Sequence, residues 1–197
     1  QTYFNSQEEI DLIEKMYFEA YRIGEISNDL ALAEPILRDA DLVSMDISAI
    51  KSADLGYYSQ FNPNGFDGRE ICAISRYAGL SDKVSAFGFF NIDNKSERSL
   101  LLSQIIWYFF EGYNYRVNEY PYISKESYFK YIVPLEDQDL VFYKSDVSER
   151  WWIEIEYEVS KDTVRKSLFP CSYQDYERSL QHQIPERWWK AMKKIYL

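Results

Sequence analysis

The stretch DADLVSMDISAIKS, residues 39–52, decides the fold class of this chain. Its centre, Leu42 to Ile47, is a short apolar run bounded by polar residues, which predicts a buried strand that ends at the carboxylate of Asp46. A long connection, residues 48–66, follows. Because a connection of this length inside a compact domain is usually functional, the strand end and the connection together form a candidate site.

The segment after this connection predicts a helix and then a second strand. Asp67 is followed three residues later by Glu70 in a capping-box pattern, and apolar residues recur at helical spacing, which predicts a helix over residues 67–78. Gly79 stands where a left-handed helix cap is expected. Residues 83–92 are apolar with little charge and predict another buried strand. Strand, helix and strand in this order predict a parallel crossover.

The remaining segments predict further helices and a β-rich carboxyl-terminal part. The apolar residues of 100–115 fall on nearly every side of a helix, so we expect it to be covered on more than one face, with Trp107 in the core. The other predicted elements are a helix that starts near Gln7, at a capping-box pattern of Ser6 and Glu9, a short or restarted helix within 28–38, strands at 140–143 and 151–157, and helices at 173–181 and 185–195.

Composition excludes several classes of protein. The 22 basic and 32 acidic residues give a net charge of −10, which repels nucleic acid and anionic membranes. The two cysteines and the single histidine, His182, do not suggest a disulfide scaffold or a zinc finger. We also find no apolar membrane span, no secretory leader and no glycine-rich phosphate loop. We therefore expect a cytoplasmic protein without nucleic-acid or membrane partners.

Asp46 is the first candidate functional residue. Ligands of parallel α/β sheets bind at the carboxyl ends of the strands, which is where Asp46 is expected to lie. A carboxylate there suits a hard metal ion or serves as a general base. The alternative is that Asp46 accepts hydrogen bonds from the following loop and holds the turn, as many aspartates at strand ends do.

Residues 39–52 resemble the late metal-binding strand of the ureohydrolase superfamily, which includes arginase, agmatinase and formimidoylglutamase. That family carries Ser-x-Asp-x-Asp there, and both aspartates bind manganese; Ser44 and Asp46 match the first part. The GFDGRE segment, residues 65–70, is similar to the family's Gly-Leu-Thr-x-Arg-Glu helix start, and residues 85–94 resemble its next strand. The resemblance implies a three-layer α/β/α sandwich with a mainly parallel sheet, and hydrolysis of guanidino or formimino C–N bonds.

Two departures from the family pattern affect its chemistry. Ser48 stands where the second manganese-binding aspartate belongs, and Asn91 stands where an arginase-like enzyme has a substrate-binding glutamate. Asp46 is therefore the single retained ligand position of the metal site, and no catalytic residue can be assigned. Binuclear hydrolysis needs two ions that share one water, so we expect this chain to bind no manganese and to be inactive.

The resemblance also suggests partners. The other family ligands, histidines and further aspartates, come from an amino-terminal half that this sequence does not contain, and His182 matches none of them. The resemblance therefore implies that the missing amino-terminal half of the same domain is a partner. A homo-oligomer is a second expectation, since ureohydrolases usually assemble and an open half-sheet favours pairing.

We expect a domain boundary between residues 118 and 119. Residues 1–118 resemble the second half of a ureohydrolase domain, and residues 119–197 form a small mixed α/β extension, rich in aromatic residues, that loosely resembles an extension on bacterial formimidoylglutamase-like proteins. The Trp pairs at 151–152 and 188–189 give a rival function, that of a non-enzymatic scaffold or protein-interaction module. The alternative is a structural role, in which one ring of each Trp pair is buried and the other lies on the opposite side of the strand or helix. Cys171 and His182 show no nucleophile motif.

Overall fold

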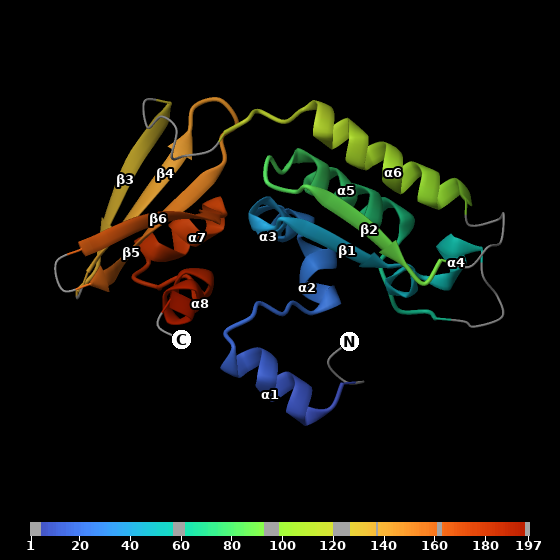
Figure 1. The fold of residues 1–197 in the computed structure, drawn as a ribbon, viewed down its shortest axis with the longest axis horizontal. Coiled ribbons are helices and arrows are strands. Elements are labelled where there is room, and N and C mark those ends of the chain that lie inside the picture. Colours follow the sequence, from blue (N-terminus) through green and yellow to red (C-terminus); the bar gives the residue numbers. More distant parts are fainter. Residues whose placement is uncertain are drawn as a thin grey trace. The chain divides into compact units, whose positions relative to one another are not determined.

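The computed structural model describes residues 5–56, 62–92, 99–119, 127–136, 138–160 and 163–195 (Figure 1). The chain divides into two compact units, which we call the parallel unit, Ile23–Glu119, and the antiparallel unit, Gln1–Arg22 with Tyr120–Leu197. The first 22 residues thus group with the carboxyl-terminal part. That a domain boundary lies between residues 118 and 119 stays a prediction. The fold is mixed α/β, with helices, a parallel sheet and an antiparallel sheet.

The parallel unit is built around the predicted crossover. Strands β1 (Leu42–Asp46) and β2 (Ala86–Phe90) pair in parallel, in register from Leu42 opposite Ala86 to Asp46 opposite Phe90. Both predicted strands and the helix between them are confirmed. The other elements of the unit are α2 (Ile23–Asn28), η2 (Leu30–Leu32), α3 (Ala33–Asp39), η3 (Ile47–Ala49), α4 (Ser52–Leu55), α5 (Gly68–Leu80) and α6 (Ser99–Asn114).

One face of the β1–β2 sheet forms the core of the parallel unit. Met45 of β1 and the partly buried Phe87 and Phe89 of β2 belong to a cluster with apolar side chains of α5 and α6. The ring centroids of Phe87 and Phe109 lie 5.0 Å apart. Because side chains alternate along a strand, one face of the sheet collects these residues and packs against the two helices.

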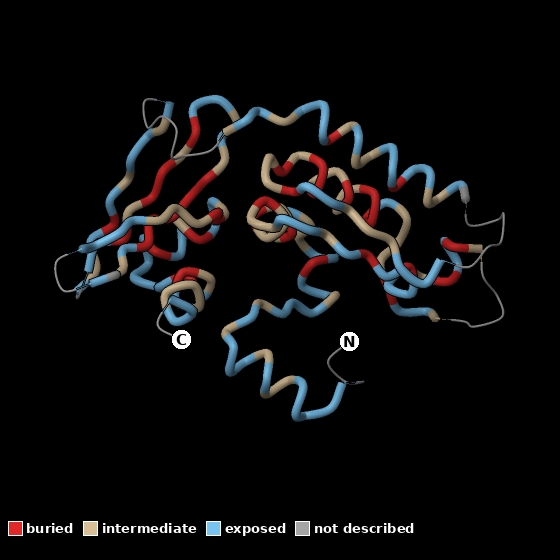
Figure 2. Tube along the Cα trace, in the orientation of Figure 1, coloured by how far each residue is buried: buried red, intermediate tan, exposed pale blue. Residues whose placement is uncertain are grey.

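The opposite face of this sheet is uncovered in the described structure. Leu42 is 64 % exposed and Phe90 is 55 % exposed, and Ser44, Asp46 and Ala86 are exposed as well. Figure 2 shows pale blue, exposed stretches along β1 and β2. Within the described residues the sheet is therefore covered on one side, and the third layer of the expected sandwich is not confirmed.

Helices α5 and α6 approach each other so closely that glycine is needed at the contact. A Cβ on Gly79 would lie 2.1 Å from the backbone oxygen of Phe109, and a Cβ on Gly112 would lie 2.3 Å from that of Arg76. The Ser75 hydroxyl, fully buried, donates to the Ile105 carbonyl at 2.7 Å. The prediction that Gly79 is a left-handed cap was wrong. It lies inside α5, where the lack of a side chain serves helix packing.

Helix α6 was also expected to be covered on more than one face, with Trp107 in the core, and among the described residues both expectations were wrong. Ile105 is fully buried, but Trp107 is 59 % exposed and Phe110 is 58 % exposed. A single stripe of α6 packs on α5 and the sheet, and the remaining apolar side chains face outward. None of the described helices is long and apolar enough to cross a membrane.

The antiparallel unit contains the predicted strands and helices of the extension. The described strands are paired in the order of the chain, β3 (Tyr128–Pro134), β4 (Asp139–Ser145), β5 (Trp151–Ser160) and β6 (Thr163–Cys171), and the helices are α1 (Gln7–Lys15), α7 (Tyr173–Leu180) and α8 (Glu186–Ile195). The expected capping box of α1 is present, since Ser6 and Glu9 bond each other's backbone N–H groups.

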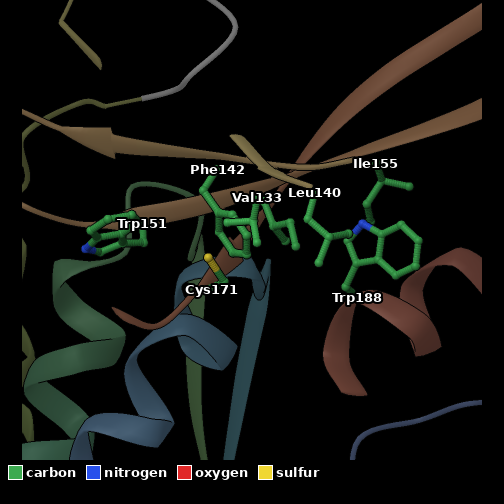
Figure 3. Close-up of a cluster of buried hydrophobic side chains, with 8 residues drawn as sticks. Val133, Leu140, Phe142, Trp151, Ile155, Cys171 and Trp188 are labelled. Carbon is green, nitrogen blue, oxygen red and sulfur yellow. The ribbon is translucent and has the colours of Figure 1, made fainter. Parts of the chain in front are cut away.

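The core of the antiparallel unit collects alternate strand residues against α8 (Figure 3). Trp151 and Trp188 are buried in this cluster, and the Trp188 Nε1–H donates to the Glu154 carbonyl at 3.0 Å. Trp152 is buried too, so the expectation of one buried ring per pair fails at 151–152. It holds for the second pair, because Trp189 is 43 % exposed.

We predict that Gly79→Ala destabilises the chain by about 3 kcal/mol, at the upper end of the usual cost of overpacking, because the added methyl meets rigid backbone. The matched control is Gly24→Ala in α2, where an added Cβ meets nothing within 4 Å. Alanine there favours the helix, so its stability should stay equal or rise slightly. Urea unfolding of both variants measures the difference, and equal stabilities would contradict the close helix crossing.

Candidate functional site

The candidate site lies at the carboxyl ends of β1 and β2. Asp46 is the last residue of β1, and Asn91 directly follows β2. Since Asp46 pairs in register with Phe90, the parallel pairing brings the next residue, Asn91, to the same edge. Ser48 joins them from η3, the short helical turn that Asp46 caps. The structure thus brings together the three residues that the sequence singled out.

Both oxygens of the Asp46 carboxylate accept hydrogen bonds from the chain itself. The backbone N–H of Ser48 donates to Oδ1 at 2.8 Å, and the Asn91 side-chain Nδ2 donates to Oδ2 at 2.7 Å. Asn91 has a φ of 58°, in the left-handed region that asparagine tolerates better than most residues. Hydrogen bonds from the Ser48 hydroxyl and backbone, and a smaller effect from Asn91, lower the pKa of Asp46. Asp46 is therefore a carboxylate at neutral pH.

Hydrogen bonds within the long connection, residues 48–66, hold its described residues together. Asn62 donates from Nδ2 to the Ser48 carbonyl at 3.2 Å and from its backbone to the Ser52 hydroxyl at 2.7 Å. The Phe66 N–H donates to the Ala49 carbonyl at 2.8 Å. A Cβ on Gly65 would lie 2.7 Å from that same carbonyl oxygen, so glycine is required there. Residues 57–61 of the connection lie outside the described residues.

The residues at this edge do not fit a pair of manganese ions. Hard divalent ions prefer several oxygen ligands, and two ions that share one water need bridging carboxylates. Asp46 supplies one carboxylate, Ser48 supplies a neutral hydroxyl, and Asn91 directs an N–H group at the carboxylate. Among the described residues, no group of three or more His, Cys, Asp or Glu side chains is placed to hold a metal ion.

Residues of the GFDGRE motif have local roles in the parallel unit. Glu70 and Asp67 form a capping box: the Asp67 N–H donates to Glu70 Oε2 at 2.7 Å, and the Glu70 N–H donates to Asp67 Oδ1 at 2.8 Å. Arg69 lines an open groove of about 840 Å³ between α5 and α6. Arg76, which also lines that groove from α5, pairs with Glu111 at 3.3 Å. The motif therefore starts a helix, as its resemblance implied.

The two cysteines and the histidine have different local environments. Cys171 packs in the core of the antiparallel unit with Ile153 and Phe142, whereas His182 is exposed just after α7. Cys72 is buried in the parallel unit, and this burial raises the pKa of its thiol. A raised thiol pKa disfavours the reactive thiolate.

A second polar cluster, which the sequence reading missed, lies across three strands of the antiparallel unit. Glu154 of β5 is buried; its Oε2 accepts from the Tyr143 hydroxyl at 3.0 Å and its Oε1 from Lys166 Nζ at 2.8 Å. Lys166 also bonds Glu156, the residue opposite it in the β5–β6 ladder. Burial, and then the bond to Glu154, raise the pKa of Tyr143 to about 12. Because the Glu154 carboxylate is already bonded on both oxygens, this cluster serves to stabilise the sheet.

No family model matches the sequence, and no curated protein matches it significantly. Among the solved structures that match is formimidoylglutamase from Bacillus subtilis, with a TM-score of 0.50 and 15 % sequence identity. Over the matched part, the fold of this chain is similar to that of the enzyme. The match covers 58 % of this chain and 40 % of the enzyme, so the chain spans less than half of that protein, and at this identity the likeness concerns the fold alone.

We predict that Tyr143→Phe lowers stability by about 1–3 kcal/mol at pH 7, because it removes a hydrogen bond to a charged group. The loss should shrink as the pH rises. The pKa of Tyr143 is raised on folding, so its contribution is complete below pH 10 and is lost as the pH approaches about 12. Urea unfolding at pH 7, 10 and 11 tests this, with exposed Tyr115→Phe as the control. A constant difference across this range would contradict the prediction.

Proposed function

We propose that this chain is the carboxyl-terminal part of a ureohydrolase-like protein that has lost binuclear manganese hydrolysis. The observation that carries the proposal is the bonding of Asp46. Its carboxylate accepts hydrogen bonds from Ser48 and Asn91, at the strand end where the resemblance implies a metal ligand. The ureohydrolase-like fold supports the ancestry, and the donor set supports the loss of the metal chemistry.

The chemistry of the substituted residues supports this proposal. A serine hydroxyl cannot replace a bridging carboxylate in charge or in denticity. Without a second carboxylate, Asp46 alone cannot hold two ions around one water, which is the arrangement that supplies the nucleophile in a two-metal site. If residues outside this chain complete a site after all, the family's substrates, linear guanidino or formimino compounds, define the class to test.

We further propose that strands and helices from outside these residues complete the parallel sheet. Within the described residues this sheet has β1 and β2 alone. Parallel sheets are stable when helices cover both faces, and isolated two-stranded sheets are marginal. The exposed Leu42 and Phe90 are suitable contacts for such a layer. The missing amino-terminal half of the same domain is the proposed source, and the result would be the three-layer α/β/α sandwich.

A non-enzymatic role in protein interaction is the second candidate. The exposure of large aromatic side chains favours it, notably Trp107 and Phe110 on α6 and Trp189 on α8. Trp151, Trp152 and Trp188 do not contribute to this role, because they are buried. In this second proposal the aromatic-rich extension contacts partners through Trp189 and its neighbours.

Calorimetric titration with manganese tests the loss of the metal site. We expect no tight binding by the natural chain and no change in Asp46→Ala or in the control Asp146→Ala, which removes a carboxylate elsewhere. The double variant Ser48→Asp, Asn91→Asp places three carboxylates at the edge and should gain manganese binding that Asp46→Ala then abolishes. Two tight equivalents in the natural chain, lost in Asp46→Ala alone, would overturn the proposal.

A screen of guanidino and formimino compounds tests the activity itself. We expect no release of urea, ammonia or formamide above the buffer rate, with or without added manganese, since the donor set lacks a second bridging carboxylate. Turnover that depends on manganese and on Asp46 would show that the enzyme function survives.

A further inference from the structure

An exposed apolar surface lies where the segment after α1 meets α8. Phe18 is 49 % exposed, and Leu12, Met16 and Trp189 are exposed as well. The Tyr17 and Trp189 rings meet edge to face with centroids 5.4 Å apart. We call the exposed side chains of residues 8–18 together with those of 189–194 the junction surface. Its centre is apolar, although its members come from opposite ends of the chain.

A partly buried ion pair holds this surface together. The Arg187 Nε donates to Glu19 Oε1 at 2.7 Å, its Nη1 donates to the Pro170 carbonyl at 3.0 Å, and its guanidinium lies over the Phe169 ring. Burial, and then the nearby Glu19 carboxylate, raise the pKa of Tyr21 to about 12. The segment after α1 is therefore bonded to α8 through Arg187, which also bonds β6. These contacts hold the exposed apolar side chains of the segment in place.

Helix α1 needs further cover to be stable. It has nine residues and buries none of them within the described structure. Isolated helices shorter than about 12–15 residues are marginal in water, and most helical stability in proteins comes from packing an apolar face. Leu12 and Met16, one turn apart, give α1 an apolar stripe that the described residues leave exposed.

The two ends of the junction surface carry opposite charge. Helix α1 contains four carboxylates and one lysine: Glu8, Glu9, Asp11, Glu14 and Lys15. Helix α8 ends in Lys193 and Lys194, whose ammonium groups lie 5.7 Å from the Trp189 ring centroid and 5.4 Å from the Phe18 ring centroid, respectively. Both lysines are exposed, so they remain accessible to a carboxylate from another molecule.

We propose that the junction surface is the interface of a two-fold homodimer, in which α1 of each copy lies against the α8 lysines of the other. A two-fold axis makes the same patch face itself, so an acidic end meets a basic end twice while the apolar centres meet once. An acidic protein of another kind would be repelled by the carboxylates of α1. A basic protein would be repelled by Lys193 and Lys194. A second copy matches both ends. The proposal is independent of the fate of the metal site.

Sedimentation equilibrium of the full chain over a concentration series tests the dimer. The mass should rise from 23.5 kDa to twice that value. Lys193→Glu with Lys194→Glu should weaken self-association at least about tenfold, a loss of about 1.4 kcal/mol. Glu8→Lys with Glu14→Lys should do the same; it leaves the capping box of Ser6 and Glu9 intact. An equimolar mixture of the two charge-reversed variants should recover the dimer as a heterodimer.

The matched control is Arg69→Glu with Lys130→Glu, which makes the same change in charge on exposed positions outside the junction surface. It should dimerise like the natural chain. Circular dichroism and urea unfolding of each variant show that it is folded. A natural chain that stays monomeric, a dimer unaffected by either charge reversal, or a mixture that fails to associate would each overturn the proposal.

Discussion

The parallel unit depends on the close crossing of α5 and α6. Glycines at positions 79 and 112 let the two helix backbones meet, and the Ser75 hydroxyl bonds a carbonyl across the contact. The crossing brings Ile71 and Ile105 into one cluster with Met45 of β1. Since the described structure covers this sheet on one face, that cluster supplies most of the apolar burial that holds the two strands. A side chain at the crossing would separate the helices and open the core.

The strand ends follow from this core. Once β1 and β2 are paired in register, Asp46 and Asn91 lie at one edge, and the amide of Asn91 occupies one oxygen of the carboxylate. In a metal centre the charge of such a carboxylate is balanced by the ion. Hydrogen-bond donors of Ser48 and Asn91 stabilise the charge of the Asp46 carboxylate, and they lower its pKa. The hydrogen bond from Asn91 to Asp46 therefore links the carboxyl ends of β1 and β2.

In the antiparallel unit, the segment after α1 and helix α8 contact each other and form one surface. The amino-terminal segment groups with the extension through the ion pair of Glu19 with Arg187 and the contact of Tyr17 with Trp189. Both ion-pair side chains are mostly buried, so breaking the pair would leave a charge without its partner in a poorly hydrated place. These contacts hold the exposed Phe18 and Trp189 beside Lys194 and Lys193, respectively.

What the sequence by itself determined is local. The capping boxes at Ser6 and Asp67 start helices, and the apolar runs at residues 42–47 and 83–92 contain strands, because these patterns act over a few neighbouring residues. Tertiary structure decided the rest. Gly79 serves helix packing and not a cap, and Trp107 is exposed while Trp152 is buried; each outcome depends on which element lies opposite, and a one-dimensional pattern does not contain that information. The bond from Asn91 to Asp46 and the Glu154 cluster likewise join residues that only strand pairing brings together.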